Sequence, residues 1–159
     1  NIFLRKRDGA AFEDATQGFG LEDFAITAAA TLADLDNDGD LDVIAVPVNA
    51  PVVAFMNNSE RSAISFKLDD AVGNRDGVGA RVEIRHDGFG TGHQSREIQL
   101  GGGFMSFDAP VAHFGLGDLT AIDGASIVWA DGRVSELAGP LEAGATYVVH
   151  RDTFSEETQ

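Results

Sequence analysis

The stretch Ala80 to Arg85 reads ARVEIR, and this alternation of apolar and charged side chains indicates the fold class. Successive side chains of a β-strand point to opposite faces, so Ala80, Val82 and Ile84 share one face of the predicted strand. The same period of two recurs over residues 64–68, and 19 Gly residues separate the short apolar runs. No window sustains the i, i+3, i+4, i+7 pattern of a long amphipathic helix. The sequence therefore predicts an all-β protein.

The second half of the chain carries enough alternating strands for two packed sheets. Asp131-Gly132 suits a type I′ hairpin turn, with Val134 to Leu137 as the returning strand and Thr146 to His150 as a closing strand. Alternation on successive strands is what a β-sandwich requires, and we expect an antiparallel one over residues 61–151. The side chains predicted to lie inside it are Ile64, Phe66, Val82, Ile84, Ile98, Ile127, Trp129 and Val148.

The amino-acid composition excludes some classes of binding partner. The chain has 159 residues, with 11 Lys and Arg against 26 Asp and Glu and a formal net charge of −15. Nucleic acids and anionic membrane surfaces are bound through Lys and Arg, so both are set aside as partners. The longest charge-free run, Val43 to Ser59, contains Pro47 and Pro51 and does not read as a membrane span. Cysteine is absent, which excludes a disulfide-stapled scaffold without identifying a compartment.

The segment ADLDNDGDLDV, residues 33–43, has the spacing of a calcium-binding loop. With Asp34 as position 1, further carboxylates fall at positions 3, 5 and 9, and Gly39 at position 6 permits a sharp turn. Position 12 holds Ala45 where an EF-hand has Glu, and both flanks read as strands. The sequence thus predicts a calcium loop between two strands. Its predicted ligands are Asp34, Asp36, Asp38, Asp40 through its backbone carbonyl, and Asp42.

Electrostatics favour a cation in this loop. Two carboxylates about 5 Å apart repel each other by roughly 3 kcal/mol at an effective dielectric constant of about 20. Converging carboxylates would make an empty, ordered loop costly. Ca²⁺ takes about six to eight oxygen ligands and is preferred over Mg²⁺, which keeps its waters. The alternative is a solvated acidic turn with splayed side chains, which leaves the spacing and Gly39 unexplained.

A weak internal repeat links the start of the chain to the segment after the acidic loop. IFLRKRDG at Ile2 to Gly9 and VAFMNNSE at Val53 to Glu60 both run from an apolar strand into a polar turn, with Phe3 and Phe55 in equivalent places. Their separation suits one four-stranded propeller blade with an insertion. A single blade cannot bury both faces, so such repeats need neighbours. With Asn1 in place of Met, this favours the end portion of a longer repeat protein, or a blade packed against a partner.

Two family resemblances rest on these and further motifs. FEDATQGFGL (residues 12–21) with AAATLADLDNDGDLDVIAV (residues 28–46) resembles the FG-GAP/VCBS repeat, the calcium-loop blade of integrin-type β-propellers. From about Asn74 the chain resembles the ASPIC/UnbV domain, which follows such repeats in bacterial secreted proteins and in cartilage acidic protein. The segments that carry the second resemblance are GNRDGVGARVEIR (Gly73–Arg85), REIQLGGGFMSFDAPVAHFGLG (Arg96–Gly117) and VWADGRV (Val128–Val134). The resemblance implies the same five-Asp ligand set, an extracytoplasmic location, interaction roles and no established catalytic residues.

Other motifs predict structure rather than chemistry. The Gly-rich segments Gly88 to Gly92 and Gly101 to Gly103 lack the context of nucleotide-binding loops. His113 is expected to be a buried, hydrogen-bonded structural residue, and Arg75 and Asp76 are expected to form an ion pair that fixes a turn. No local Ser/His/Asp signature is present. We therefore predict no catalytic and no cofactor-binding residues.

The sequence predicts three parts: a blade with a calcium loop at 1–60, the β-sandwich at 61–151 and an acidic tail at 152–159. We expect a non-catalytic, calcium-stabilised, periplasmic or secreted module, as part of a longer protein or an accessory subunit of a larger assembly. Its partners would be proteins or further repeats of the same protein, with glycans as another class. The alternative is a metal-assisted hydrolase or carbohydrate-active enzyme, which needs an open coordination position beside a base.

Overall fold

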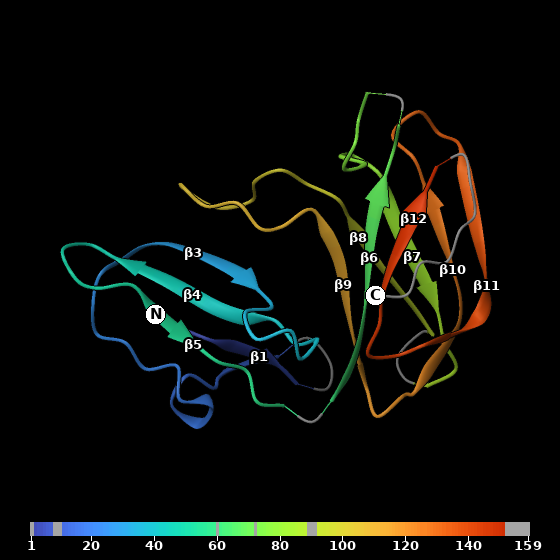
Figure 1. Ribbon diagram of the computed structural model, residues 1–159. Coiled ribbons are helices and arrows are strands. Elements are labelled where there is room, and N and C mark those ends of the chain that lie inside the picture. The colour runs from blue at the N-terminus through green and yellow to red at the C-terminus, as the bar shows by residue number, and fades with distance from the viewer. Residues whose placement is uncertain (1, 8–10, 60, 72, 89–91, 152–159) are drawn as a thin grey trace.

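Two all-β parts follow one another along the chain (Figure 1). The computed structural model describes residues 2–7, 11–59, 61–71, 73–88 and 92–151. These residues form twelve β-strands and one short 3-10 turn, Gln17–Phe19, with no α-helix among them, so the all-β prediction is confirmed. The acidic tail predicted at 152–159 lies outside the described residues.

The N-terminal unit, β1 to β5, consists of a ribbon and a small sheet. β1 (Leu4–Lys6) pairs antiparallel with β2 (Phe12–Asp14). β3 (Thr27–Ala33), β4 (Asp42–Pro47) and β5 (Val53–Phe55) form an antiparallel sheet in that order. The repeat spacing suggests a four-stranded blade, whereas β1 pairs within its own ribbon and leaves a sheet of three strands.

Local sequence explains where β4 begins and ends. Asp42 is the last of the clustered Asp residues and the first residue of β4, and the apolar residues 43–46, mostly β-branched, favour a strand. Pro47 ends the strand because it has no N–H to donate to a neighbour. Asn49 then takes a positive φ of 56°, which a short polar side chain tolerates in a turn. The chain can therefore reverse and place β5 beside β4.

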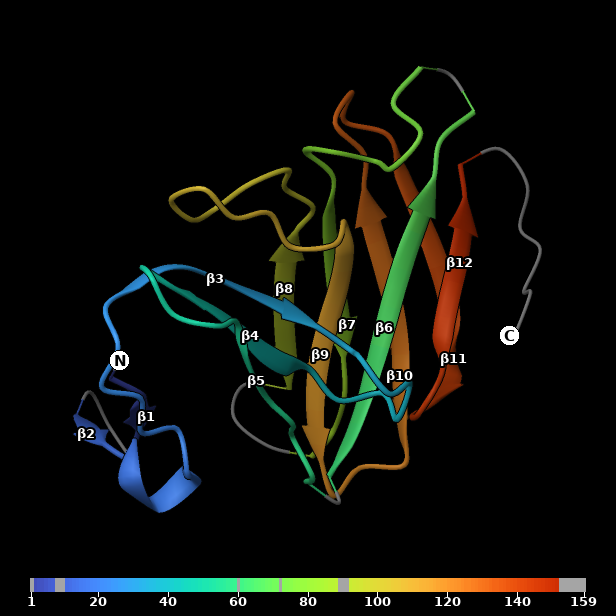
Figure 2. The same cartoon turned by 60° about the vertical axis from the view of Figure 1, so that its left-hand side comes forward.

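The second part, which we call the sandwich, contains two sheets that face each other. Its strands are β6 (Ser62–Asp69), β7 (Arg81–Arg85), β8 (His93–Glu97), β9 (Val111–Gly117), β10 (Ala121–Val128), β11 (Val134–Glu142) and β12 (Thr146–His150). One sheet has the order β11-β10-β7-β8 and the other the order β12-β6-β9. Figure 2 shows the second sheet facing the N-terminal unit, and its inner face covers the first sheet.

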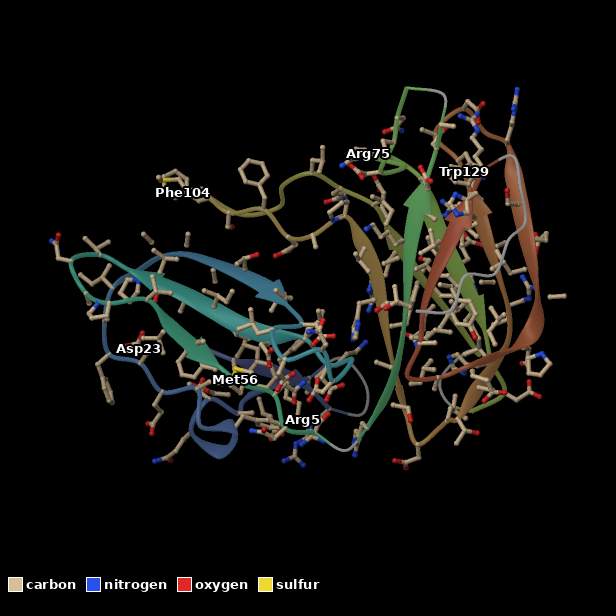
Figure 3. All side chains as sticks on the ribbon, viewed as in Figure 1. Arg5, Asp23, Met56, Arg75, Phe104 and Trp129 are labelled. Carbon is tan, nitrogen blue, oxygen red and sulfur yellow. The ribbon has the colours of Figure 1, made fainter. Side chains whose placement is uncertain are left out.

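The hydrophobic core lies between these two sheets. Phe66 is fully buried, with its ring edge-on to Phe114 at 6.0 Å between centroids and stacked on Tyr147 at 5.7 Å. Trp129 is buried as well (its position is marked in Figure 3), and its Nε1–H donates to Ser135 Oγ at 2.9 Å. Burial of a large apolar side chain contributes roughly 1.5–3 kcal/mol, so this core accounts for the stability of the sandwich.

Seven of the eight predicted core residues are buried, and Val148 is the exception. β12 pairs in parallel with β6, with Val149 opposite Leu68 and Val148 opposite Lys67. Leu68 points inward and Lys67 outward, so Val149 is the residue that enters the core. The prediction of Val148 was wrong because the phase of two adjacent Val residues is set by the partner strand. The sandwich is antiparallel as predicted, except that β12 pairs in parallel with β6.

The hairpin between β10 and β11 forms at the predicted Asp131-Gly132 step, but not as a type I′ turn. Gly132 has a positive φ of 86°, whereas Asp131 is not among the described residues with positive φ. A type I′ turn requires positive φ at both central residues. Trp129 N–H donates to the Arg133 carbonyl and Gly132 N–H to the Trp129 carbonyl, which closes the turn with glycine as the one left-handed residue.

Candidate metal centre and adjoining cleft

The acidic loop, residues 34–42, joins β3 to β4 as a loop between strands, as predicted. Asn37 and Gly39 have positive φ values of 61° and 92°. An added Cβ at Gly39 would meet nothing within 4 Å, so glycine is needed there for its backbone conformation and not for space. The two left-handed residues curl the loop back on itself and turn its carboxylates toward one another.

Three carboxylates converge in this loop. Asp34, Asp36 and Asp42 each place one carboxylate oxygen so that all three atoms lie within 4.8 Å of one another. Asp42 is fully buried, while Asp34 and Asp36 are exposed. Oxygen ligands at such spacing suit a hard divalent cation. The described residues therefore contain a three-Asp cluster that could hold a metal ion.

Asp42 is held in place by the backbone on both sides of it. Its Oδ2 accepts a hydrogen bond from Leu35 N–H at 2.8 Å, and its Oδ1 accepts one from Asn57 N–H at 2.7 Å. These bonds tie the acidic loop to the segment that follows β5. The carboxylate of Asp42 is thus part of the loop scaffold whether or not a metal is bound.

The other two predicted ligands are engaged differently. Asp38 lies outside the three-carboxylate cluster, and its Oδ1 accepts from Asp40 N–H at 2.9 Å. The Asp40 carboxylate is turned to Ser59, whose hydroxyl donates to Asp40 Oδ2 at 2.6 Å. The sequence predicted the backbone carbonyl of Asp40, and not this carboxylate, as the ligand. Asp34 Oδ2 also accepts from Gly39 N–H at 3.1 Å, which closes the loop.

The electrostatics of the loop match a cation site. Desolvation raises the pKa of Asp36 above its ordinary value, and the negative charges of Asp38, Asp42 and Asp34 add to this rise. A raised carboxyl pKa means that the ionised form is disfavoured by its surroundings. A bound cation would reverse this, because opposite charge favours the ionised carboxylate.

The acidic loop also forms one wall of a cleft of about 440 Å³. The opposite wall is the outer face of sheet β12-β6-β9, which the loop crosses in Figure 2. Ser65 and His113 line that wall, Asp34 and Leu41 line the loop side, and Arg96 of β8, from the other sheet of the sandwich, also lines the cleft. Sequence reasoning did not find this cleft, because its residues come from strands that are far apart in the chain.

His113 lies at the centre of this wall. It is half-buried and hydrogen-bonded, with Nδ1 at 3.1 Å from Ser65 Oγ on the paired strand. Burial lowers the pKa of its imidazole, and Arg96 adds to this lowering, while Asp40 and Asp34 oppose it. The expected hydrogen bond is confirmed, but the side chain faces the cleft and not the core.

The turn that precedes β7 is fixed by a residue that the sequence analysis missed. Arg75 and Asp76 form the expected ion pair at 3.1 Å, with Arg75 largely exposed. Exposed pairs of this kind contribute little stability. Asn74 instead closes the turn, with its side-chain amide donating to the Val78 carbonyl at 2.8 Å and its Oδ1 accepting from Val78 N–H at 3.1 Å. An Asn that bonds its own loop backbone is the signal that could have identified it.

Comparison with known families defines the class of the sandwich. The chain matches the family described as ASPIC and UnbV over residues 71–156, which is more than half of its length. The protein belongs to the ASPIC and UnbV family. The match covers β7 to β12, whereas β6, which completes the core, precedes it. No curated protein matches the chain. Within the described residues there is no helix of the length and apolarity that a membrane crossing requires.

Proposed function

We propose that this protein is a non-catalytic, calcium-stabilised, extracytoplasmic interaction module, with an FG-GAP/VCBS-like N-terminal unit attached to the ASPIC/UnbV sandwich. The observation that carries the proposal is the contrast in burial between the two parts. Among the described residues, the buried hydrophobic side chains belong to the sandwich except for Ala45. A part of a protein that is ordered but has no core of its own needs a neighbour to cover it.

The apolar side chains of the N-terminal unit are exposed instead. Phe24 is 95% exposed. The other large apolar side chains exposed in this unit are Ile2, Phe3, Leu4, Phe12, Phe19, Ile26, Leu32, Leu35, Val46, Val48, Val52 and Met56. Exposed apolar side chains that gather into large patches mark interaction sites, and this unit carries many of them. The partner would be another protein or further repeats of the same protein.

Calcium is the cation that best fits the acidic loop. Asp34, Asp36 and Asp42 supply three clustered carboxylates, and the Asp38 carboxylate and the Asp40 carbonyl are the further ligands that the sequence spacing suggests. Ca²⁺ takes more oxygen ligands than Mg²⁺ and tolerates irregular geometry. The ion would neutralise the mutual repulsion of the carboxylates and so order the loop between β3 and β4.

An extracytoplasmic location agrees with this kind of site. Asp34 and Asp36 are exposed, and calcium sites of extracellular modules bind with dissociation constants of about 10⁻⁴–10⁻³ M. A site with an affinity in that range would be filled only where calcium is abundant. The family resemblance of the N-terminal unit to blades of secreted proteins supports the same proposal.

The absence of catalysis is also part of the proposal. In hydrolytic triads the base is oriented by a carboxylate on its second ring nitrogen. His113 bonds Ser65 through Nδ1, and within the described part of the chain no hydrogen bond to its Nε2 is found. The Asp42 carboxylate likewise accepts a backbone hydrogen bond at each oxygen, one from Leu35 in the loop and one from Asn57 after β5. These groups support a binding role over a metal-assisted hydrolase.

Sedimentation of the chain at micromolar concentration tests this function. With Ca²⁺ present, we expect self-association, or association with a co-purifying protein, through the N-terminal unit. Phe24→Ser with Ile26→Ser should weaken association at least about tenfold, because hot spots are apolar and central. The matched control is Val134→Ser, which removes an exposed side chain of β11 and should leave association unchanged. A monodisperse monomer that captures nothing, with and without Ca²⁺, would overturn the proposal.

A further inference from the structure

The cleft between the acidic loop and the sandwich is lined by one Arg side chain that no described ion pair includes. Arg96 stands on β8 and lines the cleft. Its guanidinium lies over the ring of the buried Phe114 at 5.4 Å, and its Nη1–H donates to the Ser95 carbonyl at 2.9 Å. Among the described ion pairs, none includes Arg96. Arg96 is exposed, so its charge, which no described ion pair uses, is accessible to an anion in the cleft.

The remaining groups of the cleft are suited to hydroxyl groups. Ser65 and Thr146 offer hydroxyls from paired positions on β6 and β12, and His113 offers its ring. Asp108 and Asp34 offer carboxylate oxygens, and the small residues Ala63, Gly144 and Ala145 leave room between them. The cavity of about 440 Å³ falls in the usual size range of small-molecule sites.

We propose that this cleft binds a small carboxylate that carries several hydroxyl groups, of the class of uronic acids. The carboxylate pairs with Arg96, and the hydroxyls bond Ser65, Thr146 and Asp108. A ligand with a single negative charge fits a single Arg, because Asp34 and Asp108 would repel a more highly charged anion. The inference rests on the proposed calcium site, since Asp34 on the facing wall must be neutralised before a carboxylate can enter.

Calcium and the uronate should therefore each increase the affinity of the chain for the other. Binding free energies at two sites are coupled reciprocally, so a cation that favours the anion is itself bound more tightly when the anion is present. The acidic loop supplies both Asp34 of the cleft and the three-carboxylate cluster, which gives the coupling a short physical path.

The test is a titration of the chain with uronates in about 2 mM Ca²⁺. Binding is monitored through the chemical shifts of the backbone amides. Glucuronate and galacturonate should shift the amides of β6 and β9 saturably. Glucose, which lacks the carboxylate, and acetate, which lacks the hydroxyls, should each bind at least about tenfold more weakly. Arg96→Gln should weaken uronate binding at least about tenfold, since a charge-assisted pair is lost. Arg133→Gln, with the same change of charge in the turn between β10 and β11, should bind like the unaltered chain.

Three outcomes would overturn the inference. They are no saturable shift at about 10 mM uronate, equal affinity for glucose, or an Arg96→Gln chain that binds as well as the original. A separate calcium titration distinguishes failure of the proposed function from failure of the uronate inference. If Ca²⁺ raises the melting temperature but no uronate binds, the calcium site stands and the cleft ligand is wrong. If Ca²⁺ has no effect, the proposed calcium site is wrong and this inference falls with it.

Discussion

At the scale of single residues, the Asp residues of the acidic loop have two roles. The sequence predicts all five as metal ligands, whereas the structure shows that one of them also holds the loop in place. Asp42 is buried and accepts hydrogen bonds from two backbone amides. Asp36 is exposed, and its pKa is raised by desolvation and by its neighbours. Asp42 therefore holds the loop scaffold in addition to its place in the three-carboxylate cluster, whereas Asp36 is an exposed member of that cluster.

Substitution by Asn should distinguish these two roles. Asp42→Asn should cost roughly 1.5–3 kcal/mol of unfolding free energy with or without calcium, because the amide cannot accept two backbone N–H groups. Asp36→Asn should abolish most of the calcium-dependent rise in melting temperature but leave the chelated protein as stable or more stable, because a repelled charge is gone. Thermal unfolding in Ca²⁺ and in excess chelator measures both. A full calcium response in Asp36→Asn would contradict its assignment as a ligand.

His113 gives the stability of the protein a dependence on pH. Burial lowers its pKa below the ordinary value of 6.5, so near that value the unfolded chain binds more protons than the folded one. Its contribution is fully favourable above about pH 6.5 and is lost as the pH falls through the lowered folded pKa. Denaturant unfolding between about pH 7.5 and 5.5 should show falling stability. His113→Phe should flatten that slope. An unchanged slope in His113→Phe would exclude His113 as the cause.

At the scale of elements, one short contact joins the sandwich to the free edge of β3. Asp108, just before β9, accepts from Leu32 N–H at 2.9 Å and from Thr31 Oγ at 2.8 Å through its Oδ1. Thr31 Oγ also lies 3.0 Å from the Phe107 carbonyl. An edge strand exposes unpaired amides that invite pairing with other chains. Asp108 therefore covers one of these amides and positions the N-terminal unit against the cleft.

Removing this contact should free the edge of β3 without unfolding the sandwich. Asp108→Ala should speed hydrogen exchange at the Leu32 amide and cost about 1 kcal/mol, the usual net contribution of such hydrogen bonds. Asp108→Asn, which keeps an acceptor, is the matched control and should remain close to the original. Amides of β7 and β10 should stay protected in both variants. Unchanged exchange at Leu32 in Asp108→Ala would show that the contact does not hold β3.

The same scale shows what sequence can and cannot predict. The strand with Val82 and Ile84 is specified by its own alternation, and the acidic loop by its own spacing, so both were found locally. Val149 was missed because its inward phase depends on pairing with β6, more than seventy residues earlier. The cleft was missed for the same reason, since Arg96 and His113 meet only when β8 and β9 become neighbours.

At the scale of the whole molecule, exposed apolar side chains are concentrated in two regions. Besides the N-terminal unit, the apolar loop of residues 98–107 exposes Leu100, Phe104, Met105 and Phe107. Figure 3 shows Phe104 near the end of this loop, beyond the sandwich and on the same side as the N-terminal unit. The loop contains no charged residue in a strongly acidic chain. The exposed surface that we propose for partners therefore has two sources, the N-terminal unit and this loop of the sandwich.

The parallel pairing of β12 with β6 has a consequence for how the chain is made. The first strand of the sandwich, β6, can complete its pairing only after the last strand, β12, has been made, because β6 lies between β9 and β12 in its sheet. During synthesis from the N-terminus, Phe66 and Leu68 stay uncovered on one side until residues 146–150 emerge. Such long-range closure slows folding. A chain of this topology remains open while it is being produced, which gives chaperones an interval in which to bind it.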